Sequence, residues 1–252
     1  MTDGPDEELT GAGGTVVARY TRETRAGMPC AELVAELAPR AEVVAALLAE
    51  RPGWVIVTGE ALSAALLDAG ATRMRHSYQM LRDLRADPPP AEWAELEPPA
   101  GLRLVPLRAG PDAPVADLRA LTERAYPPGH PDHSPVDGLA RLHEAATDLL
   151  RDATPPPCPS SAAVYAGDRP VAAVLNGHRP GETWVFNVMR DPAEAYAGLG
   201  TLLLRRAEAV AAGHGDAVLG LAVSHGNPAR AVYARLGFRT TGSYVTVVLP
   251  GA

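Results

Sequence analysis

The chain of 252 residues contains no lysine, so all 23 of its basic residues are arginine. A Walker A phosphate loop needs its lysine, and the Schiff bases of pyridoxal enzymes and aldolases need a primary amine. The sequence therefore excludes these three kinds of site. A basic set made of arginine alone is also typical of a GC-rich genome.

Cysteines, positive charge and long apolar runs are scarce as well. Cys30 and Cys158 lie far apart without metal-ligand spacing, so we expect no metal and unpaired thiols in a reducing cytoplasm. The net charge of −7 disfavours a nucleic-acid partner, because little would neutralise a row of phosphates. No apolar run is long enough to cross a bilayer, so we expect no membrane partner. The acidic N-terminus resembles neither a secretory signal nor a transit peptide.

Proline-rich segments divide the chain. Prolines at 88–90 and 98–99 border residues 91–97, which we interpret as a linker. We therefore predict an N-terminal lobe of residues 1–97 and a second domain of residues 98–252. In the lobe, hydrophobic spacing predicts helices at 30–50 and 61–69 and strands at 54–58 and 73–84.

The second domain alternates strands and helices. Gly167 and Asp168 stand between two apolar runs and predict a hairpin, so the middle of this domain is expected to be antiparallel. The predicted fold class is α/β with a mixed (α+β), mostly antiparallel sheet flanked by helices, preceded by a smaller α/β lobe. We predict strands at 102–107, 162–166, 170–177, 183–189, 217–223 and 243–249, and helices at 115–125, 136–151, 198–212 and 228–236.

Residues 192–204 follow a predicted strand, open a predicted helix and read PAEAYAGLGTLLL. Backbone N–H groups at such a turn are unpaired, and the helix dipole adds partial positive charge. Gly198 and Gly200 lack a Cβ atom, so a pyrophosphate can approach the backbone closely. Leu203 stands where a Rossmann fingerprint needs its third glycine, which argues against dinucleotide binding. An ordinary turn from loop to helix is the alternative interpretation.

A second motif spans residues 219–238, which read LGLAVSHGNPARAVYARLGF. Asn227 is suited to cap a helix, and Pro228 to its first position, where a missing N–H is harmless. Gly237 is suited to end that helix in the left-handed conformation. Each residue has a structural explanation by itself. None of these explanations accounts for the joint occurrence of the Asn cap, Tyr233 and the Leu-Gly-Phe end.

Together the two segments resemble the acetyl-CoA site of the GNAT superfamily of acyl-CoA-dependent N-acetyltransferases. The stretch from Pro192 to Gly200 has the spacing of that family's phosphate loop. Residues 221–238 match its later motif, in which a strand, an Asn and a helix with Tyr end in Leu-Gly-Phe. The resemblance covers roughly residues 100–252.

Three positions depart from the family pattern. Ala195 stands where the family usually has Arg or Gln, Tyr196 where it commonly has Gly, and Arg190 where an apolar residue is more usual. These changes alter the surroundings of the pyrophosphate but keep the backbone donors.

The resemblance implies that a primary amine of a small molecule or peptide attacks the thioester of acetyl-CoA, the co-substrate, directly. It places the cofactor between strands at 186–189 and 220–223, where a backbone N–H near Val188 polarises the carbonyl. Tyr233 would protonate the leaving thiolate, and Asn227 would hold the pantetheine arm. For Tyr233, a half-buried helix tyrosine is the alternative. The expected acetyl-CoA contacts are Val188, Met189, Arg190, Ala195, Tyr196, Ala197, Gly198, Leu199, Gly200, Thr201, Asn227 and Tyr233.

The general base is less clear from the sequence. Glu182 at the start of a strand and Glu123 near the end of a helix are candidate catalytic residues. His130 and His133 lie in a Pro-rich loop that in the family borders the acceptor site, so they are candidate substrate-binding residues. Either histidine can also take the proton, directly or through water. As a metal site this pair lacks an ordered third ligand, and for each of the four residues the sequence favours a solvated surface position over a catalytic role.

Two other functions stay open. A non-catalytic acetyltransferase-like module that binds CoA or a partner would explain Ala195 and the missing base. A GNAT-fold enzyme with another acyl donor would differ in the width of the gap near Val188 and Ala222. We expect a monomer or homodimer.

The N-terminal lobe contains an echo of the second motif. Residues 64–80 repeat its helix–Gly–strand ending without a glycine phosphate loop. This echo suggests a degenerate, CoA-free second acetyltransferase-like half, and a small unrelated cap domain is the alternative.

Overall fold

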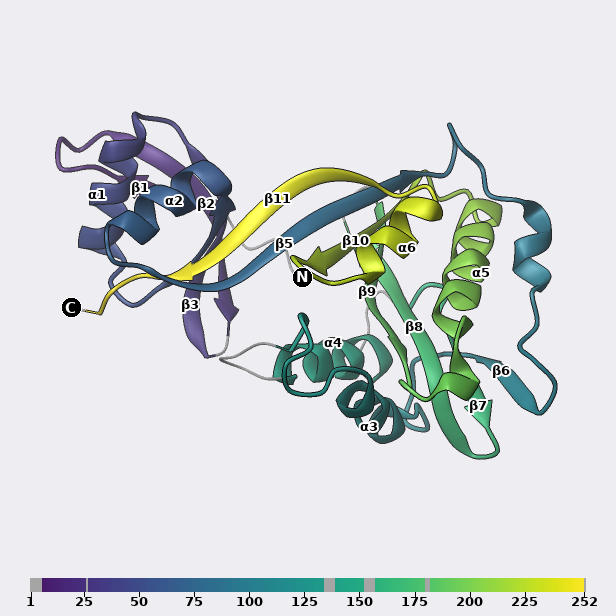
Figure 1. Ribbon diagram of the computed structural model, residues 1–252. Coiled ribbons are helices and arrows are strands. Elements are labelled where there is room, and N and C mark those ends of the chain that lie inside the picture. The colour runs from purple at the N-terminus through teal and green to yellow at the C-terminus, as the bar shows by residue number, and fades with distance from the viewer. Residues whose placement is uncertain (1–5, 26, 134–138, 152–156, 180–181, 252) are drawn as a thin grey trace. The chain divides into compact units, whose positions relative to one another are not determined.

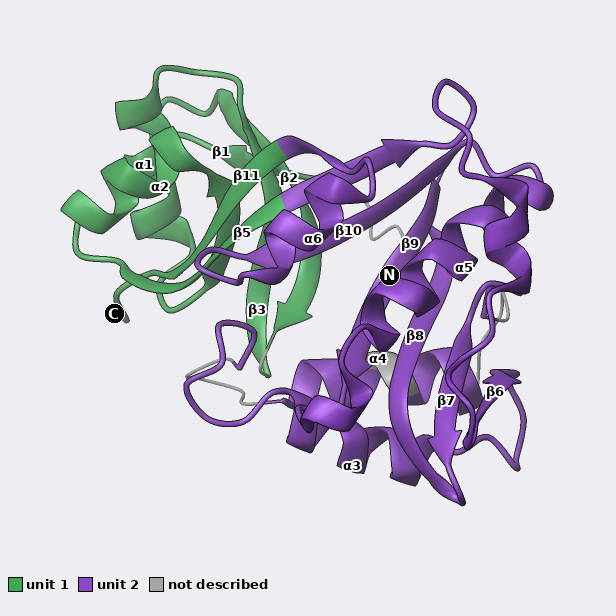
Figure 2. Ribbon diagram, turned by 45° about the vertical axis from the view of Figure 1, so that its right-hand side comes forward, with its two compact units in different colours: residues 1–78, 134–136, 242–252 green, residues 79–133, 137–241 purple. Residues whose placement is uncertain are grey.

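The computed structural model describes residues 6–25, 27–133, 139–151, 157–179 and 182–251, with the elements labelled in Figure 1. Figure 2 shows two compact units, the first made of residues 1–78, 134–136 and 242–252 and the second of residues 79–133 and 137–241. Strands β5 (Thr72–Asp83) and β11 (Arg239–Val248) each contribute residues to both units. The division into domains of residues 1–97 and 98–252 stays a prediction.

The first unit is a mixed sheet with two helices, α1 (Arg40–Glu50) and α2 (Glu60–Asp68). Its strands lie in the order β1 (Asp6–Thr10), β2 (Val16–Arg25), β3 (Met28–Glu36), β4 (Val55–Gly59), β11 and β5. β3 and β4 pair parallel, whereas the pairs β1–β2, β2–β3 and β4–β11 are antiparallel. Ile56 packs in a core with Leu47 and Leu66 of the helices, whereas Val55 and Val57 pack in a second cluster with Cys30. This alternation is the two-residue period of a strand that is buried on both faces.

The prediction of one helix over residues 30–50 is wrong in its first part. Residues up to Glu36 form β3, and α1 begins only at Arg40, directly after Pro39. Proline has no N–H to donate and disfavours helical conformation in the residue before it, so the helix starts beyond it. The sequence analysis also missed β1 and β2, while β4, α2 and β5 are confirmed within a residue at each end.

The second unit has a sheet in the order β10 (Val218–Ser224), β9 (Glu182–Arg190), β8 (Arg169–Arg179), β7 (Ala162–Ala166) and β6 (Leu102–Pro106), with the end of β5 beside β10. The strands from β6 to β9 pair antiparallel, and Gly167 makes the predicted turn between β7 and β8 with φ of 59°. β9 and β10 pair parallel, because α5 (Leu199–Gly213) connects them as a crossover. The predicted mixed, mostly antiparallel sheet is confirmed.

Helices cover both faces of this sheet. α3 (Val115–Ala125) and α4 (Ala140–Arg151) form a core with Leu175 and Met189 from β8 and β9. α5 contacts β7, β8 and β9, and the intervening residues of β8, such as Val174, are also fully buried. A short helix, α6 (Ala229–Arg235), follows β10 (Figure 1). Residues 136–138 of the helix predicted at 136–151 lie outside the described residues.

The segment that the sequence analysis interpreted as a linker is packed. Residues Ala91–Glu95 form a 3-10 helix, η1, that contacts α5. The Trp93 ring lies 5.0 Å from the Arg205 guanidinium carbon and 5.9 Å from that of Arg82. Arg206 donates a hydrogen bond to the carbonyl of Leu96 at 2.7 Å. Prolines border this segment, but its tryptophan anchors it.

The two units share a helix ending. After α2, the N–H of Ala71 bonds to the carbonyl of Leu66 at 2.9 Å, and after α6 the N–H of Phe238 bonds to that of Tyr233 at 3.1 Å. The glycine before each donor has a positive φ, 98° at Gly70 and 90° at Gly237. Both bonds are the long bond of the Schellman motif, so the echo predicted from the sequence is present in the backbone.

Candidate functional site

β9 and β10 separate within their length. Their parallel pairing ends at Val185 and Leu221, although β9 continues to Arg190 and β10 to Ser224. At the same point β9 contains one extra residue, Phe186, because Val185 faces Asn176 of β8 while the next pair joins residues 187 and 175. Such a bulge bends a strand and interrupts its pairing. The bulge thus opens the sheet at the place where the sequence analysis expected a cofactor.

Tyr126, directly after α3, reaches this opening. Its hydroxyl lies 2.5 Å from the carbonyl oxygen of Val188 and 2.9 Å from Oδ1 of Asn187. In a strand, the N–H and C=O of one residue point to the same edge, so the N–H of Val188 also points into the opening. Burial raises the pKa of Tyr126 well above its usual value, and the nearby Tyr233 and Asp132 add to this shift. The phenol therefore keeps its proton at neutral pH.

The loop after Tyr126 holds the two predicted histidines in different tautomers. Nδ1 of His130 accepts the N–H of Asp132 at 3.1 Å, so the neutral ring carries its proton on Nε2. Burial lowers the pKa of His130, although Asp132 opposes the shift. Nδ1 of His133 lies 2.9 Å from the carbonyl oxygen of Tyr126 and must be the donor, so the lone pair of its neutral ring is on Nε2.

Asp132 joins this loop to the start of α6. Its Oδ2 accepts a 2.5 Å hydrogen bond from the Asn227 amide, and its Oδ1 lies 3.3 Å from the N–H of Ser224. Oδ1 of Asn227 accepts the N–H of Ala229 at 2.8 Å, which is the capping role that the sequence predicted. Pro228 lies between them in helical conformation, with φ of −63° and ψ of −19°.

Tyr233 of α6 belongs to the same cluster. It is 8% exposed, and its ring meets that of Phe238 edge to face at 6.2 Å. Burial raises its pKa, and Asp132 raises it further. Electrostatic interaction with Tyr233 also raises the pKa of Tyr126. The structure thus brings together Tyr126, His130, Asp132, Asn227 and Tyr233.

The glycine loop, residues 192–198, connects β9 to α5. A 3-10 turn, η2 (Glu194–Tyr196), precedes Gly198, which has φ of 85°. A side chain would be strained there, so this turn requires glycine. The first α5 bond runs from the N–H of Leu202 to the carbonyl of Gly198, so the N–H groups of residues 199–201 precede the helix ladder.

The outer side of this loop is open. A Cβ atom on Gly198 or Gly200 would meet no other atom within 4 Å, and Ala195 and Ala197 are exposed. Free N–H groups at a helix start, without side chains in front of them, suit a phosphate. The residues present therefore fit the pyrophosphate of a CoA molecule.

Arg190 binds the carbonyl groups at the start of this loop. Its Nη1 donates to the carbonyl oxygens of Asp191 at 2.8 Å and Ala193 at 3.1 Å. These oxygens would otherwise add negative charge near an anion. The arginine that departs from the family pattern thus supports the loop.

The other predicted cofactor contacts differ in how exposed their side chains are. The side chains of Met189 and Leu199 are 1% and 2% exposed, so only their backbones can touch a ligand. Val188, Tyr196 and Thr201 are half-buried. The full set stays a prediction.

The two predicted carboxylates lie elsewhere. Glu182 begins β9, six residues before Val188, which corresponds to about 20 Å along a strand. Burial raises its pKa, although Arg179 opposes the shift. Glu123 is exposed, and its Oε1 lies 3.9 Å from Nε2 of His143 on α4. Their catalytic roles stay predictions.

Sequence reasoning missed Tyr126, Asp132 and Asn187. The first two stand in the Pro-rich loop already singled out for its histidines, and the tyrosine and aspartate there were a usable signal. Asn187 is 4% exposed on a bulged strand, and a buried amide next to a bulge has no sequence signature.

Residues 115–238 match the model of the Acetyltransferase (GNAT) family. A mixed sheet with an opened parallel strand pair, a glycine loop and a helix-borne tyrosine defines the class of the protein. Residues 115–238 are thus a GNAT acetyltransferase domain, in the C-terminal part of the chain as predicted. No curated protein matches the chain.

Solved structures share this fold over nearly the whole chain. A GCN5-related N-acetyltransferase from Sphaerobacter thermophilus is 18% identical, with a TM-score of 0.60 over 97% of this chain and 81% of that one. A GCN5-related N-acetyltransferase from Kribbella flavida is 20% identical, with a TM-score of 0.57 over 98% and 90%. A tandem GNAT protein from the clavulanic acid biosynthesis pathway is 18% identical, with a TM-score of 0.55 over 94% and 80%. These similarities confirm the predicted fold.

Two further findings concern the described residues alone. No three or more of their His, Cys, Asp and Glu side chains are grouped so as to hold a metal ion. No helix among them is both long and apolar enough to span a membrane.

Proposed function

We propose that the protein is an N-acetyltransferase that uses acetyl-CoA as co-substrate and acetylates a primary amine of a small molecule or peptide. One observation carries this proposal: β9 and β10 stop pairing after Val185 and Leu221, and the buried phenol of Tyr126 contacts the backbone of β9 at Val188 beyond that point. Acetyl-CoA, when bound, supplies an acetyl group activated as a thioester.

In the proposed mechanism, backbone N–H groups bind the cofactor and stabilise the oxyanion, and a side chain donates the proton. The first turn of α5, directly after the glycine loop, offers the N–H groups of residues 199–201 to the pyrophosphate. The N–H of Val188 points into the opening, where a preorganised donor stabilises a developing oxyanion. Tyr233 Oη holds a proton at neutral pH and acts as the general acid.

His133 is the better placed of the two loop histidines to take a proton. Its Nδ1–H is donated to the Tyr126 carbonyl, which leaves the lone pair of Nε2 available. Nδ1 of His130 is already an acceptor for Asp132, so its Nε2 is a donor and suits substrate binding. We therefore propose His133 as the general base and His130 as an acceptor-site donor.

Calorimetric titration with CoA and acetyl-CoA tests the cofactor. Wild-type protein is expected to bind both at micromolar concentrations. Gly200→Trp fills the open space before the helix without changing the backbone, and is expected to abolish binding. Gly200→Ala is the matched control, because a single methyl group meets no atom there and favours the helix by about 1 kcal/mol.

The outcomes separate the proposed function from its alternatives. Binding that survives in Gly200→Trp would place the cofactor elsewhere. No binding by the wild type would refute the acetyl-CoA assignment and favour another acyl donor or a module without catalysis. Binding without acetyl transfer to a panel of amines would favour the non-catalytic module.

A further inference from the structure

Asp191 stands between β9 and the glycine loop and is 6% exposed. Its Oδ1 accepts the N–H of Ala193 at 3.1 Å, which fixes the first turn of the loop. Its own N–H bonds to the carbonyl of Val171 in β8 at 2.8 Å. The residue therefore anchors the loop to the sheet through its backbone and shapes the loop through its side chain.

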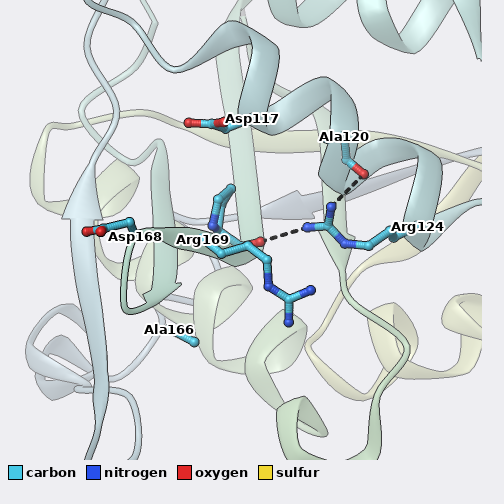
Figure 3. Close-up of a pocket in the computed structure, with 7 residues that line it drawn as sticks. Asp117, Ala120, Arg124, Ala166, Asp168 and Arg169 are labelled. Carbon is cyan, nitrogen blue, oxygen red and sulfur yellow. Dashed lines mark hydrogen bonds between the residues drawn. The ribbon is translucent and has the colours of Figure 1, made fainter.

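Arg124 of α3 binds the other oxygen of this carboxylate. Its Nε donates to Oδ2 of Asp191 at 3.0 Å. Figure 3 shows its remaining nitrogens bonded to the carbonyl oxygens of Ala120 and Pro170, each at 3.0 Å. These bonds fix the guanidinium in one orientation, beside a surface pocket of about 360 Å³.

Arg169 ties the same carboxylate to the middle of the loop. Its Nη1 lies 3.5 Å from Oδ2 of Asp191, and its Nη2 lies 3.4 Å from the hydroxyl of Tyr196. The glycine loop is thus held at Ala193 and at Tyr196 by groups that meet at Asp191. Because Arg169 is half exposed, we expect it to contribute less than Arg124.

These contacts favour the ionised carboxylate. Burial disfavours the charge, but the bond from Ala193 and the two arginines outweigh it and hold the pKa of Asp191 below its usual value. An ionised acceptor makes stronger hydrogen bonds than a neutral one.

The end of α3 holds β9 at two points. Arg124 binds Asp191 at the end of the strand, and Tyr126 binds the carbonyl of Val188 three residues earlier. Both lie within two residues of the helix terminus, so any shift of that terminus reaches the opened strand and the glycine loop together.

We propose that Asp191 is a positioning residue whose ion pair with Arg124 couples the end of α3 to the glycine loop and holds that loop ready to bind CoA. This inference rests on the proposed function, because CoA is the ligand that the loop would serve.

The test uses the full chain and two single variants, Asp191→Asn and Arg124→Gln, with their double variant. In titrations, each single variant is expected to bind CoA about 10-fold more weakly. Either substitution breaks the same ion pair, so the two losses should not add. The double variant is expected to match Asp191→Asn rather than show a 100-fold loss. Asp168→Asn is the control, because Asp168 is an exposed carboxylate that lines the same pocket (Figure 3).

Steady-state kinetics distinguish positioning from a general loss of structure. The KM for acetyl-CoA is expected to rise about 10-fold in both single variants, while the KM for the amine stays within twofold. CoA affinities within twofold of wild type, or losses that add fully in the double variant, would overturn the inference.

Hydrogen exchange keeps the inference testable if wild-type protein binds no CoA. The proposed function would then fail, but the amides of residues 193–201 should still exchange faster in Asp191→Asn and Arg124→Gln than in Asp168→Asn. Equal exchange in all three variants would overturn the coupling itself. Should Asp191→Asn fail to fold, the comparison of Arg124→Gln with Asp168→Asn gives the same answer.

Discussion

The two units bury different kinds of polar group. Among the described residues, the first unit buries the hydroxyl-bearing side chains of Tyr20, Thr58, Ser63 and Thr246 and the Cys30 thiol, but no charged side chain or amide. The second unit also buries ionisable side chains and amides: Arg82, Asp191, Glu208, Asn176, Asn187 and Asn227. A buried charge or amide lowers stability unless it is fully bonded. This cost in stability falls on the second unit, which contains the family domain. Three of its buried polar residues, Asn187, Asp191 and Asn227, border the proposed site.

The ion pairs of the two units differ in degree of burial. In the first unit, Arg19 pairs with Glu8 with both side chains about half exposed, where a pair contributes little, and Arg25 pairs with Glu32 with side chains 13% and 12% exposed. In the second unit, Arg82 and Glu208 lie 2.7 Å apart and are 5% and 0% exposed. This pair links β5 to α5, and Arg82 also bonds the carbonyl of Leu236 at the end of α6. The buried pair therefore joins the helix after the glycine loop to the helix of Tyr233.

The largest expected effect compares two buried tyrosines. Tyr233→Phe removes the proposed general acid and is expected to lower kcat about 10²- to 10⁴-fold with little change in the KM for acetyl-CoA. Tyr20→Phe in the first unit removes bonds to Glu7 and Arg51 and is expected to cost about 1 kcal/mol of stability without changing kcat. Steady-state rates and urea unfolding measure both. Equal kcat values for Tyr233→Phe and wild type would contradict the role of Tyr233 as general acid.

The next prediction concerns the pH dependence of stability. Burial raises the pKa of Glu208 to about 8, although Arg82 opposes the shift. In the unfolded chain this pKa is about 4.3. A raised pKa means that the folded state favours the protonated form, so the stabilisation is complete below about pH 4 and is lost as the pH rises to about 8.

Glu208→Gln mimics the neutral form. Wild-type protein should therefore lose stability relative to Glu208→Gln between about pH 4 and pH 8, by at most about 1.4 kcal/mol per pH unit. Urea unfolding at several pH values measures the difference. Glu8→Gln, in the exposed pair of the first unit, should change stability by less than about 1 kcal/mol. A Glu208→Gln variant that is less stable by a constant amount at every pH would show that this carboxyl is charged throughout.

The smallest expected effect compares two glycines. A Cβ atom on Gly220 of β10 would lie 2.5 Å from the Trp184 ring and 2.8 Å from Leu81, so Gly220→Ala is expected to cost about 1–3 kcal/mol. Gly59, the N-cap of α2 in the first unit, has open space and φ of −67°. Gly59→Ala is therefore expected to change stability by less than about 1 kcal/mol, because the lower entropy of the unfolded chain offsets the weaker cap. Denaturant unfolding measures both. Similar stability in the two variants would show that β10 can shift where it pairs with β9.

Prediction from sequence worked best where a local pattern was enough. α3 and β7 have the predicted bounds, and Gly237 ends α6 as expected, because apolar period and glycine conformation are local properties. The helix predicted over residues 30–50 failed because Leu, Val and Ala suit a strand buried on both faces as well as a helix. Strand β3 shows this, since Cys30 packs in one cluster and the next residue, Ala31, packs in the other.

The candidate site was predicted in part for the same reason. Asn227 and Tyr233 stand in a motif with fixed spacing, and the structure places both in one cluster. Tyr126 and Asp191 belong to it through contacts over 62 and 67 residues of chain, to Val188 and Arg124. The periodicity of a sequence does not reveal contacts between residues that are so far apart along the chain.

Local sequence patterns were enough to predict the helices and strands of the second unit, the glycine turn before α5 and the family of the domain at residues 115–238, because each depends on neighbours along the chain. Tertiary structure decided where β9 opens, which histidine keeps a free lone pair and which charges are buried. Those features depend on hydrogen bonds and desolvation among groups that only folding brings together.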